Sequence, residues 1–167
     1  LTGFVSEKEL GISIPKSIQL SGNLKGSPQD LSTKAFLQTS DGNIRVDGNF
    51  TNQEEVAFTG KIISEELQLG NLLQNESLGA LNLDIETLGK GSTVNTIDAK
   101  LDATINSFSY NNYEITDLNI SGEIENGAGT ISSNYKDENL DIVFNSQVEL
   151  DSVKPKANLN LDLKGVR

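Results

Sequence analysis

A cluster of oxygen-bearing side chains between positions 137 and 141 is the first feature of this sequence that could do chemistry. Asp137, Glu138, Asn139 and Asp141 supply carboxylate and amide oxygens, which are the ligands that Ca²⁺ prefers in proteins. Their spacing is not that of an EF-hand loop, and no calcium-binding repeat accompanies it. The pattern therefore favours a solvated turn over a calcium site.

Two pairs of adjacent glutamates, Glu54-Glu55 and Glu65-Glu66, are the next candidates. Glycosidases use two carboxylates that face one substrate. Successive side chains of a strand point to opposite faces, so neighbouring glutamates there do not converge on one ligand. We interpret both pairs as charged turns.

A glycine-rich stretch at residues 89–93 reads Gly-Lys-Gly-Ser-Thr and faintly resembles a phosphate-binding loop. Such a loop needs a longer glycine spacing and a helix that begins directly after it. Neither is present in the sequence, so we expect a plain hairpin loop at this position.

Histidine, cysteine and tryptophan are absent from the chain. Without cysteine the chain has no disulfide, no thiolate metal site and no cysteine nucleophile. Without histidine it lacks the commonest general base and the commonest transition-metal ligand, and a Ser-His-Asp triad is excluded. We therefore predict a non-enzymatic protein with no catalytic residues, no metal site and no cofactor.

The net charge of the chain is −11 and its isoelectric point is about 4.4. The thirteen Lys and Arg residues are scattered singly and form no basic stripe. Phosphate backbones repel such a surface, so nucleic acid is excluded as a partner. Bare anionic lipid headgroups are disfavoured for the same reason, whereas acyl chains are not.

The elements that must position any site are β-strands. Apolar and polar residues alternate along most of the chain, and a period of two over such lengths is the signature of a half-buried strand. The clearest runs are residues 18–24, 44–50, 56–62, 81–85, 99–105, 118–124 and 157–163. Turn signals separate them at 41–42, 111–112 and 126–127, with longer polar connections at 51–55, 89–92 and 136–139. We predict an all-β antiparallel meander of about ten strands.

The segment 64–75 is the exception to this alternation. Its leucines allow a short helical turn near 70–75, and Gly70 argues against a long helix. No linker divides the chain, so residues 1–167 are expected to form a single β-repeat segment. The chain begins at Leu1 and contains no Met, and we interpret it as a fragment of a longer protein.

An internal repeat of the form apolar-x-apolar-x-Gly-x-apolar occurs at 18–24, 44–50, 56–62 and 118–124. Each glycine falls on the apolar face of its strand. Glycine in a strand interior marks a bend or a close approach. Its repetition predicts a sheet that curves regularly.

Three stretches of this pattern resemble the AsmA and TamB-like family of bacterial envelope proteins, in an Asn-rich version of the Bacteroidetes type. The first stretch is the progression LQLGNLL, LGALNL, LGKG at 67–73, 78–83 and 88–91. The second is the hairpin SYNNYEI followed by LNISG, at 109–115 and 118–122. The third is the step KDENL at 136–140, where Glu138 stands in place of the usual Pro. The likeness extends over roughly residues 15–165.

This resemblance implies a folded-over sheet, called a β-taco, with an apolar concave face and a polar convex face. It implies a periplasmic segment of a lipid conduit for outer-membrane biogenesis in a Gram-negative bacterium. The expected partners are phospholipid acyl chains and, through the parent protein, an outer-membrane partner of the Omp85 type. The parent protein is expected to be anchored in the inner membrane.

The residues expected to line the groove are the apolar members of the alternating runs. They are Ile18, Leu20, Leu24, Leu37, Ile44, Val46, Phe50, Phe58, Ile62, Leu81, Leu83, Ile85, Leu101, Ile105, Ile120, Ile124, Ile142, Phe144, Leu159 and Leu161. Two alternatives fit the same alternation. One is a closed barrel or sandwich that binds one small apolar ligand, and the other is a structural or adhesive repeat module with a filled core.

Overall fold

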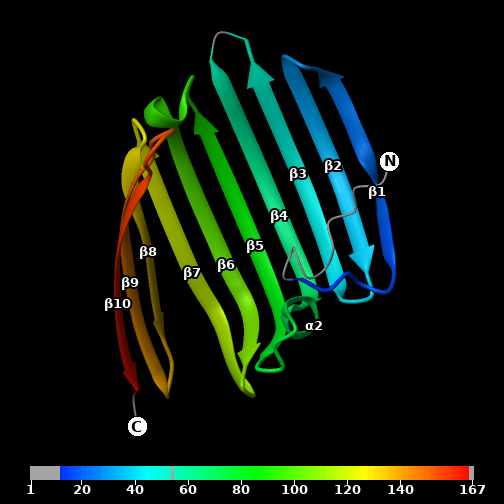
Figure 1. The fold of residues 1–167 in the computed structure, drawn as a ribbon, viewed down its shortest axis with the longest axis vertical. Coiled ribbons are helices and arrows are strands. Elements are labelled where there is room, and N and C mark those ends of the chain that lie inside the picture. The colour runs from blue at the N-terminus through cyan, green and yellow to red at the C-terminus, as the bar shows by residue number, and fades with distance from the viewer. Residues whose placement is uncertain (1–11, 54, 166–167) are drawn as a thin grey trace.

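The protein is a single ten-stranded antiparallel sheet in which every strand pairs with its neighbours in the sequence (Figure 1). The structure is a computed structural model and describes residues 12–53 and 55–165. The strands are β1 (Ile18–Ser27), β2 (Asp30–Thr39), β3 (Gly42–Asn52), β4 (Val56–Gln68), β5 (Leu78–Lys90), β6 (Asp98–Tyr110), β7 (Tyr113–Glu125), β8 (Ala128–Lys136), β9 (Leu140–Glu149) and β10 (Lys156–Gly165). The predicted all-β meander is confirmed.

Two short helical elements interrupt the meander. Helix α2 (Leu69–Leu73) lies between β4 and β5 and confirms the helical turn predicted near 70–75. A 3₁₀ turn, η1 (Val94–Thr96), lies between β5 and β6 and was not predicted. Its capping box, in which Thr93 and Thr96 bond reciprocally, explains a turn that hydrophobic periodicity does not signal.

The sheet is not closed, since β1 and β10 stand at its two ends. A barrel would require these two strands to pair, and a sandwich would require a second sheet. Neither geometry describes the strands of residues 12–53 and 55–165. The closed barrel and the sandwich considered as alternatives are therefore wrong as descriptions of this fold.

The hairpin turns have the backbone conformation expected from their residues, and one of them lies one residue earlier than predicted. Asn111, Asn112 and Asn126 have positive φ, as two-residue primed turns require. In the β2–β3 hairpin Thr39 pairs with Gly42, so the turn consists of residues 40–41 and not of the predicted 41–42. The connection predicted at 89–92 begins later, because β5 continues to Lys90.

The register gathers the apolar residues on one face of the sheet. In β3 and β4, Val46 lies opposite Ile62 and Phe50 opposite Phe58. The same parity continues across every neighbouring pair, so that Leu20 meets Leu37 at one end and Phe144 meets Leu161 at the other. We call this side the apolar face and the opposite side the polar face.

The sheet is a single layer with almost no enclosed core. Among the described residues, Ala103 and Tyr135 are the buried hydrophobic ones. The accessible surface is 11622 Å², against about 8,000 Å² expected of a compact monomer of this mass. The excess corresponds to a face that a second layer covers in ordinary domains.

The sheet is curved. Figure 1 shows β1 to β7 broadside and β8 to β10 nearly edge-on, so the sheet bends toward its C-terminal end. Register shifts between Ser64 and Leu67 in β4, and near Leu83 in the β5–β6 pair, interrupt the ladders there. Such bulges increase the local twist and bend the bulged strand.

Candidate apolar binding face

All the residues predicted to line a groove lie on the apolar face. The pairings place each of them on the same side, from Ile18 in β1 to Leu161 in β10. The strand β8, which the alternation did not single out, brings Ile131, Ser133 and Tyr135 to the same face. The structure thus gathers these side chains into one continuous surface.

Burial on this face varies from its middle to its edges. Ser64, Ala103, Ser133, Tyr135 and Ser146 are the buried non-glycine residues among those described, and all of them belong to the apolar face. At the edges, Leu20 is 71% exposed and Leu159 is 72% exposed. The apolar face is therefore more covered in its middle strands than at its edge strands β1 and β10.

One row of the apolar face contains three glycines, two threonines and a serine beside two large aliphatic side chains. Gly48 in β3 lies directly opposite Gly60 in β4. The neighbours of this pair on either side are Thr33 and Thr87, whose methyl groups lie beside the two glycines. We call the line the glycine row, and its members from β2 to β9 are Thr33, Gly48, Gly60, Thr87, Leu101, Gly122, Ile131 and Ser146.

Cross-strand ion pairs cover the polar face. Lys34 pairs with Asp47 at 2.9 Å, and Lys100 with Glu123 at 2.9 Å. Hydrogen bonds to these carboxylates raise the pKa of both lysines, with a smaller contribution from the opposite charge. The side chains are well exposed, so each pair stabilises the sheet only weakly.

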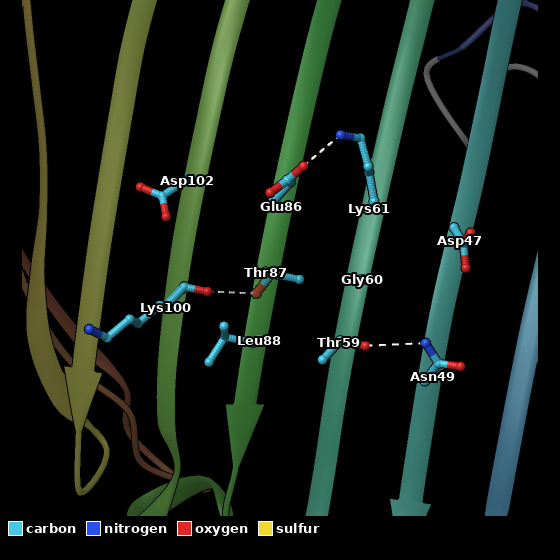
Figure 2. A pocket seen from close by; sticks show the side chains of 10 residues that line it. All are labelled: Asp47, Asn49, Thr59, Gly60, Lys61, Glu86, Thr87, Leu88, Lys100 and Asp102. Atoms are coloured by element: carbon cyan, nitrogen blue, oxygen red, sulfur yellow. Dashed lines mark hydrogen bonds and ion pairs between the residues drawn. The ribbon is translucent and has the colours of Figure 1, made fainter.

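A hollow lies on the polar face, over strands β3 to β6 (Figure 2). Figure 2 shows Lys61 reaching Glu86 across it, at 2.5 Å, while Asn49 donates to Thr59. Its remaining lining residues are Asp47, Gly60, Thr87, Leu88, Lys100 and Asp102. Lys61 and Glu86, which could act as acid and base, form an ion pair with each other.

A hydrogen-bonded cluster closes the β8–β9 turn. The Asp137 carboxylate accepts hydrogen bonds from the hydroxyls of Tyr113 and Tyr135, and from the backbone N–H groups of Asn139 and Leu140. The phenol hydrogen bonds, that of Tyr113 first, hold the pKa of Asp137 well below its usual range. The same carboxylate raises the pKa of Tyr113 to about 12.

The hydrogen bonds of this cluster involve the oxygens that were considered as calcium ligands. The Asp137 oxygens are occupied by the phenols and the turn's own amides, and Asp141 pairs with Lys136 at 3.0 Å. No group of three or more acidic side chains among the described residues is placed to hold a metal ion. The turn interpretation therefore fits the geometry.

The other candidates from the sequence do not form sites in the described residues. Glu65 and Glu66 lie within β4, at its register shift, so the interpretation of this pair as a charged turn is wrong. The carboxylate of Glu65 lies 3.4 Å from the guanidinium of Arg45 in β3. Glu54 lies outside the described residues. Gly89 and Lys90 belong to β5, and the three-residue turn η1 is the helical element nearest after them. The stretch at 89–93 therefore does not have the geometry of a phosphate loop.

None of the helical elements in the described part of the chain is long and apolar enough to span a bilayer. Comparison with known proteins adds no relative: no family model, no curated protein and no solved structure matches this chain.

Proposed function

We propose that this chain is a non-enzymatic segment of a lipid conduit, in which the apolar face carries phospholipid acyl chains. The observation that carries the proposal is the uncovered apolar face, which continues without a break in pairing from β1 to β10. A face of this extent on a soluble domain normally marks a binding surface.

The energetics favour acyl chains on such a surface. Each methylene moved from water onto an apolar surface gains about 0.8 kcal/mol. The face consists mainly of aliphatic and aromatic side chains, with glycines, threonines and serines among them. A ligand held by such non-directional contacts has no fixed register, so an acyl chain can slide along the face.

The open edges of the sheet support the hypothesis that this chain is one segment of a longer sheet. Every residue of β1 and every residue of β10 is exposed. Unpaired edge strands bind further strands readily, so the parent protein can extend the sheet at either edge. We place the parent protein in the periplasm of a Gram-negative bacterium, anchored in the inner membrane, with an outer-membrane partner of the Omp85 type, on the resemblance to AsmA and TamB-like proteins.

Native mass spectrometry of the purified chain, with lipid extraction of the same sample, tests the proposal. We expect phospholipid to co-purify in variable numbers per chain, because an open face has no single bounded site. A lipid-free chain would contradict the proposal and favour a structural or adhesive module.

Matched variants sharpen this experiment. Leu20→Asp with Leu159→Asp places two charges on the apolar face of the edge strands. Asn23→Asp with Asn158→Asp places the same charges on the polar face of the same strands. We expect lipid capture to fall in the first variant and to persist in the second. Equal capture by both variants would show that the apolar face is not the binding surface.

A further inference from the structure

The two edge strands of the sheet expose apolar side chains that have a neighbouring strand on one side only. Every residue of β1 and of β10 is exposed. The large hydrophobic residues among them are Ile18, Leu20, Leu24, Leu159, Leu161 and Leu163, and all of these lie on the apolar face. A further strand beside either edge would cover them in the way that cross-strand neighbours cover each other inside the sheet.

Neither edge is protected against strand addition along its central part. Soluble sheets protect their edges with Pro, bulges, short strands and charged side chains. β1 and β10 contain no Pro, and each pairs with its inner neighbour over ten residues without a register shift. Their charged residues lie outside the stretches 18–24 and 157–161. Both edges therefore present a regular row of backbone groups to an incoming strand.

The direction of the strands makes the two edges complementary to each other. All neighbouring strands are antiparallel and the sheet contains ten of them, so β1 and β10 run in opposite directions. A second copy that is displaced along the sheet, without being turned over, brings its β1 beside β10 in antiparallel orientation. The apolar faces of the two copies then lie on the same side. The ladder that joins neighbouring strands within the chain can thus join two copies.

The side chains of the two edges fit in this arrangement. Both strands have ten residues, and pairing over the full length places Leu159 opposite Leu24 and Leu161 opposite Gly22. A large aliphatic residue opposite a glycine already occurs inside the sheet, where Leu101 is paired with Gly122. No two charges of the same sign lie opposite each other in this register.

A two-fold pairing of identical edges fits less well. Directly opposite residues of an antiparallel pair point to the same face. Full-length pairing of β1 with the β1 of another copy would place Ile18 opposite Ser27, and the corresponding pairing of β10 would place Leu159 opposite Asp162. Both would set an apolar face beside a polar one. Only pairing of β10 with β1 uses the whole of each edge and keeps the faces together.

We infer that the β10 edge is a docking surface for the β1 edge of a second copy of this chain, so that chains join head to tail into one longer sheet. Such a contact is heterologous, and heterologous contacts that do not close into a ring produce open assemblies. The apolar face continues from each copy into the next. The inference goes beyond the proposed function and does not depend on a bound lipid.

Cross-linking of cysteine variants tests the docking surface, because the chain contains no cysteine of its own. Asn23 and Asn160 are exposed, lie on the polar face and are opposite each other in the inferred register. Asn23→Cys and Asn160→Cys chains are mixed without lipid and treated with a short bismaleimide. We expect a cross-linked dimer from the mixture and none from either variant alone. A chain that carries both substitutions should give a ladder of products beyond the dimer.

Two controls separate this contact from random collision. A mixture of Gln19→Cys and Asn160→Cys chains moves one thiol four residues along β1, about 13 Å from the matching position, and should lose the product. A mixture of Gln19→Cys and Lys164→Cys chains should restore it, since these residues are opposite in the inferred register. Asn134→Cys mixed with Asn145→Cys places exposed thiols on interior strands and should give no product.

Each other result overturns the inference. Cross-linking of Asn23→Cys or Asn160→Cys chains with themselves would show two-fold pairing of identical edges. Equal yields from edge and interior positions would show collision without docking. No product from any edge pair would leave strands of the parent protein as the occupants of the edges. None of these results bears on phospholipid capture, so failure of the head-to-tail contact and failure of the conduit are distinguishable.

Discussion

The ring of Phe58 in β4 lies over Gly89 in β5, on the apolar face of the sheet. A Cβ at residue 89 would stand 2.5 Å from the ring's Cζ and 2.9 Å from the carbonyl oxygen of Asp98. Gly89 is buried beneath the ring. This glycine, unlike Gly48, is fixed by what packs against it inside the chain.

Replacing Gly89 should therefore destabilise the sheet. Gly89→Ala forces the Phe58 ring and the β6 backbone to move, and overpacking of this kind costs about 1–3 kcal/mol. Gly48→Ala, where a Cβ finds its nearest atoms at 3.5 Å, is the control and should not lower stability. Urea unfolding of both variants measures the difference, and equal midpoints would show that the ring does not fix residue 89.

Acid should weaken the β8–β9 turn through Asp137. The pKa of this carboxyl is lower in the folded chain than its ordinary value of about 3.9. Its contribution to stability is therefore complete above the ordinary pKa and is lost as the pH falls below it. Asp137→Asn should flatten the acid side of a plot of unfolding free energy against pH.

The same measurement on Asp117→Asn provides the control. Asp117 has positive φ, which Asn tolerates equally well, so the change preserves the backbone. We expect this variant to keep the wild-type acid dependence. An unchanged acid profile in Asp137→Asn would show that the carboxylate does not stabilise the turn.

Alkali should weaken the same cluster through the Tyr113 phenol. The Asp137 carboxylate raises the pKa of Tyr113 to about 12, from 10.0. The folded phenol therefore stays protonated where the unfolded one ionises, and this contribution to stability is lost as the pH rises from about 10 toward about 12. Burial and the hydrogen bond to Asp137 raise the pKa of Tyr135 as well. Ultraviolet titration of tyrosinate should therefore show late-titrating phenols that move earlier in Asp137→Asn, and Tyr113→Phe should remove one of them.

Edge strands should cause the isolated chain to associate. β1 and β10 are exposed throughout and each has one unpaired side, and such edges promote strand pairing between molecules. Sedimentation velocity should show concentration-dependent self-association. A charge on the apolar face of the edge, Leu161→Lys, should reduce it, whereas Asn160→Lys on the polar face should reduce it less. A monomer at all concentrations would contradict the expected edge pairing.

The residue types along the chain are enough to assign the parity of the strands. A pleated backbone sends successive side chains to opposite faces, so the alternation of Ile44, Val46 and Phe50 with polar residues assigns these side chains to one face before any pairing is known. The turn chemistry of Asn111, Asn112 and Asn126 likewise follows from their tolerance of positive φ. Both properties are local, and both appear in the structure as predicted.

The tertiary structure alone decided the properties that depend on register and on accumulated twist. The alignment of Gly48 with Gly60, and of Ser146 with the same row, is set by seven successive strand pairings from β2 to β9. The hydrogen bond from Tyr113 to Asp137 joins β7 to the β8–β9 turn, although β8 lies between them in the sequence. Closure of the sheet depends on whether twist and bulges bring β10 back to β1, and here they leave the two strands at opposite ends of an open sheet.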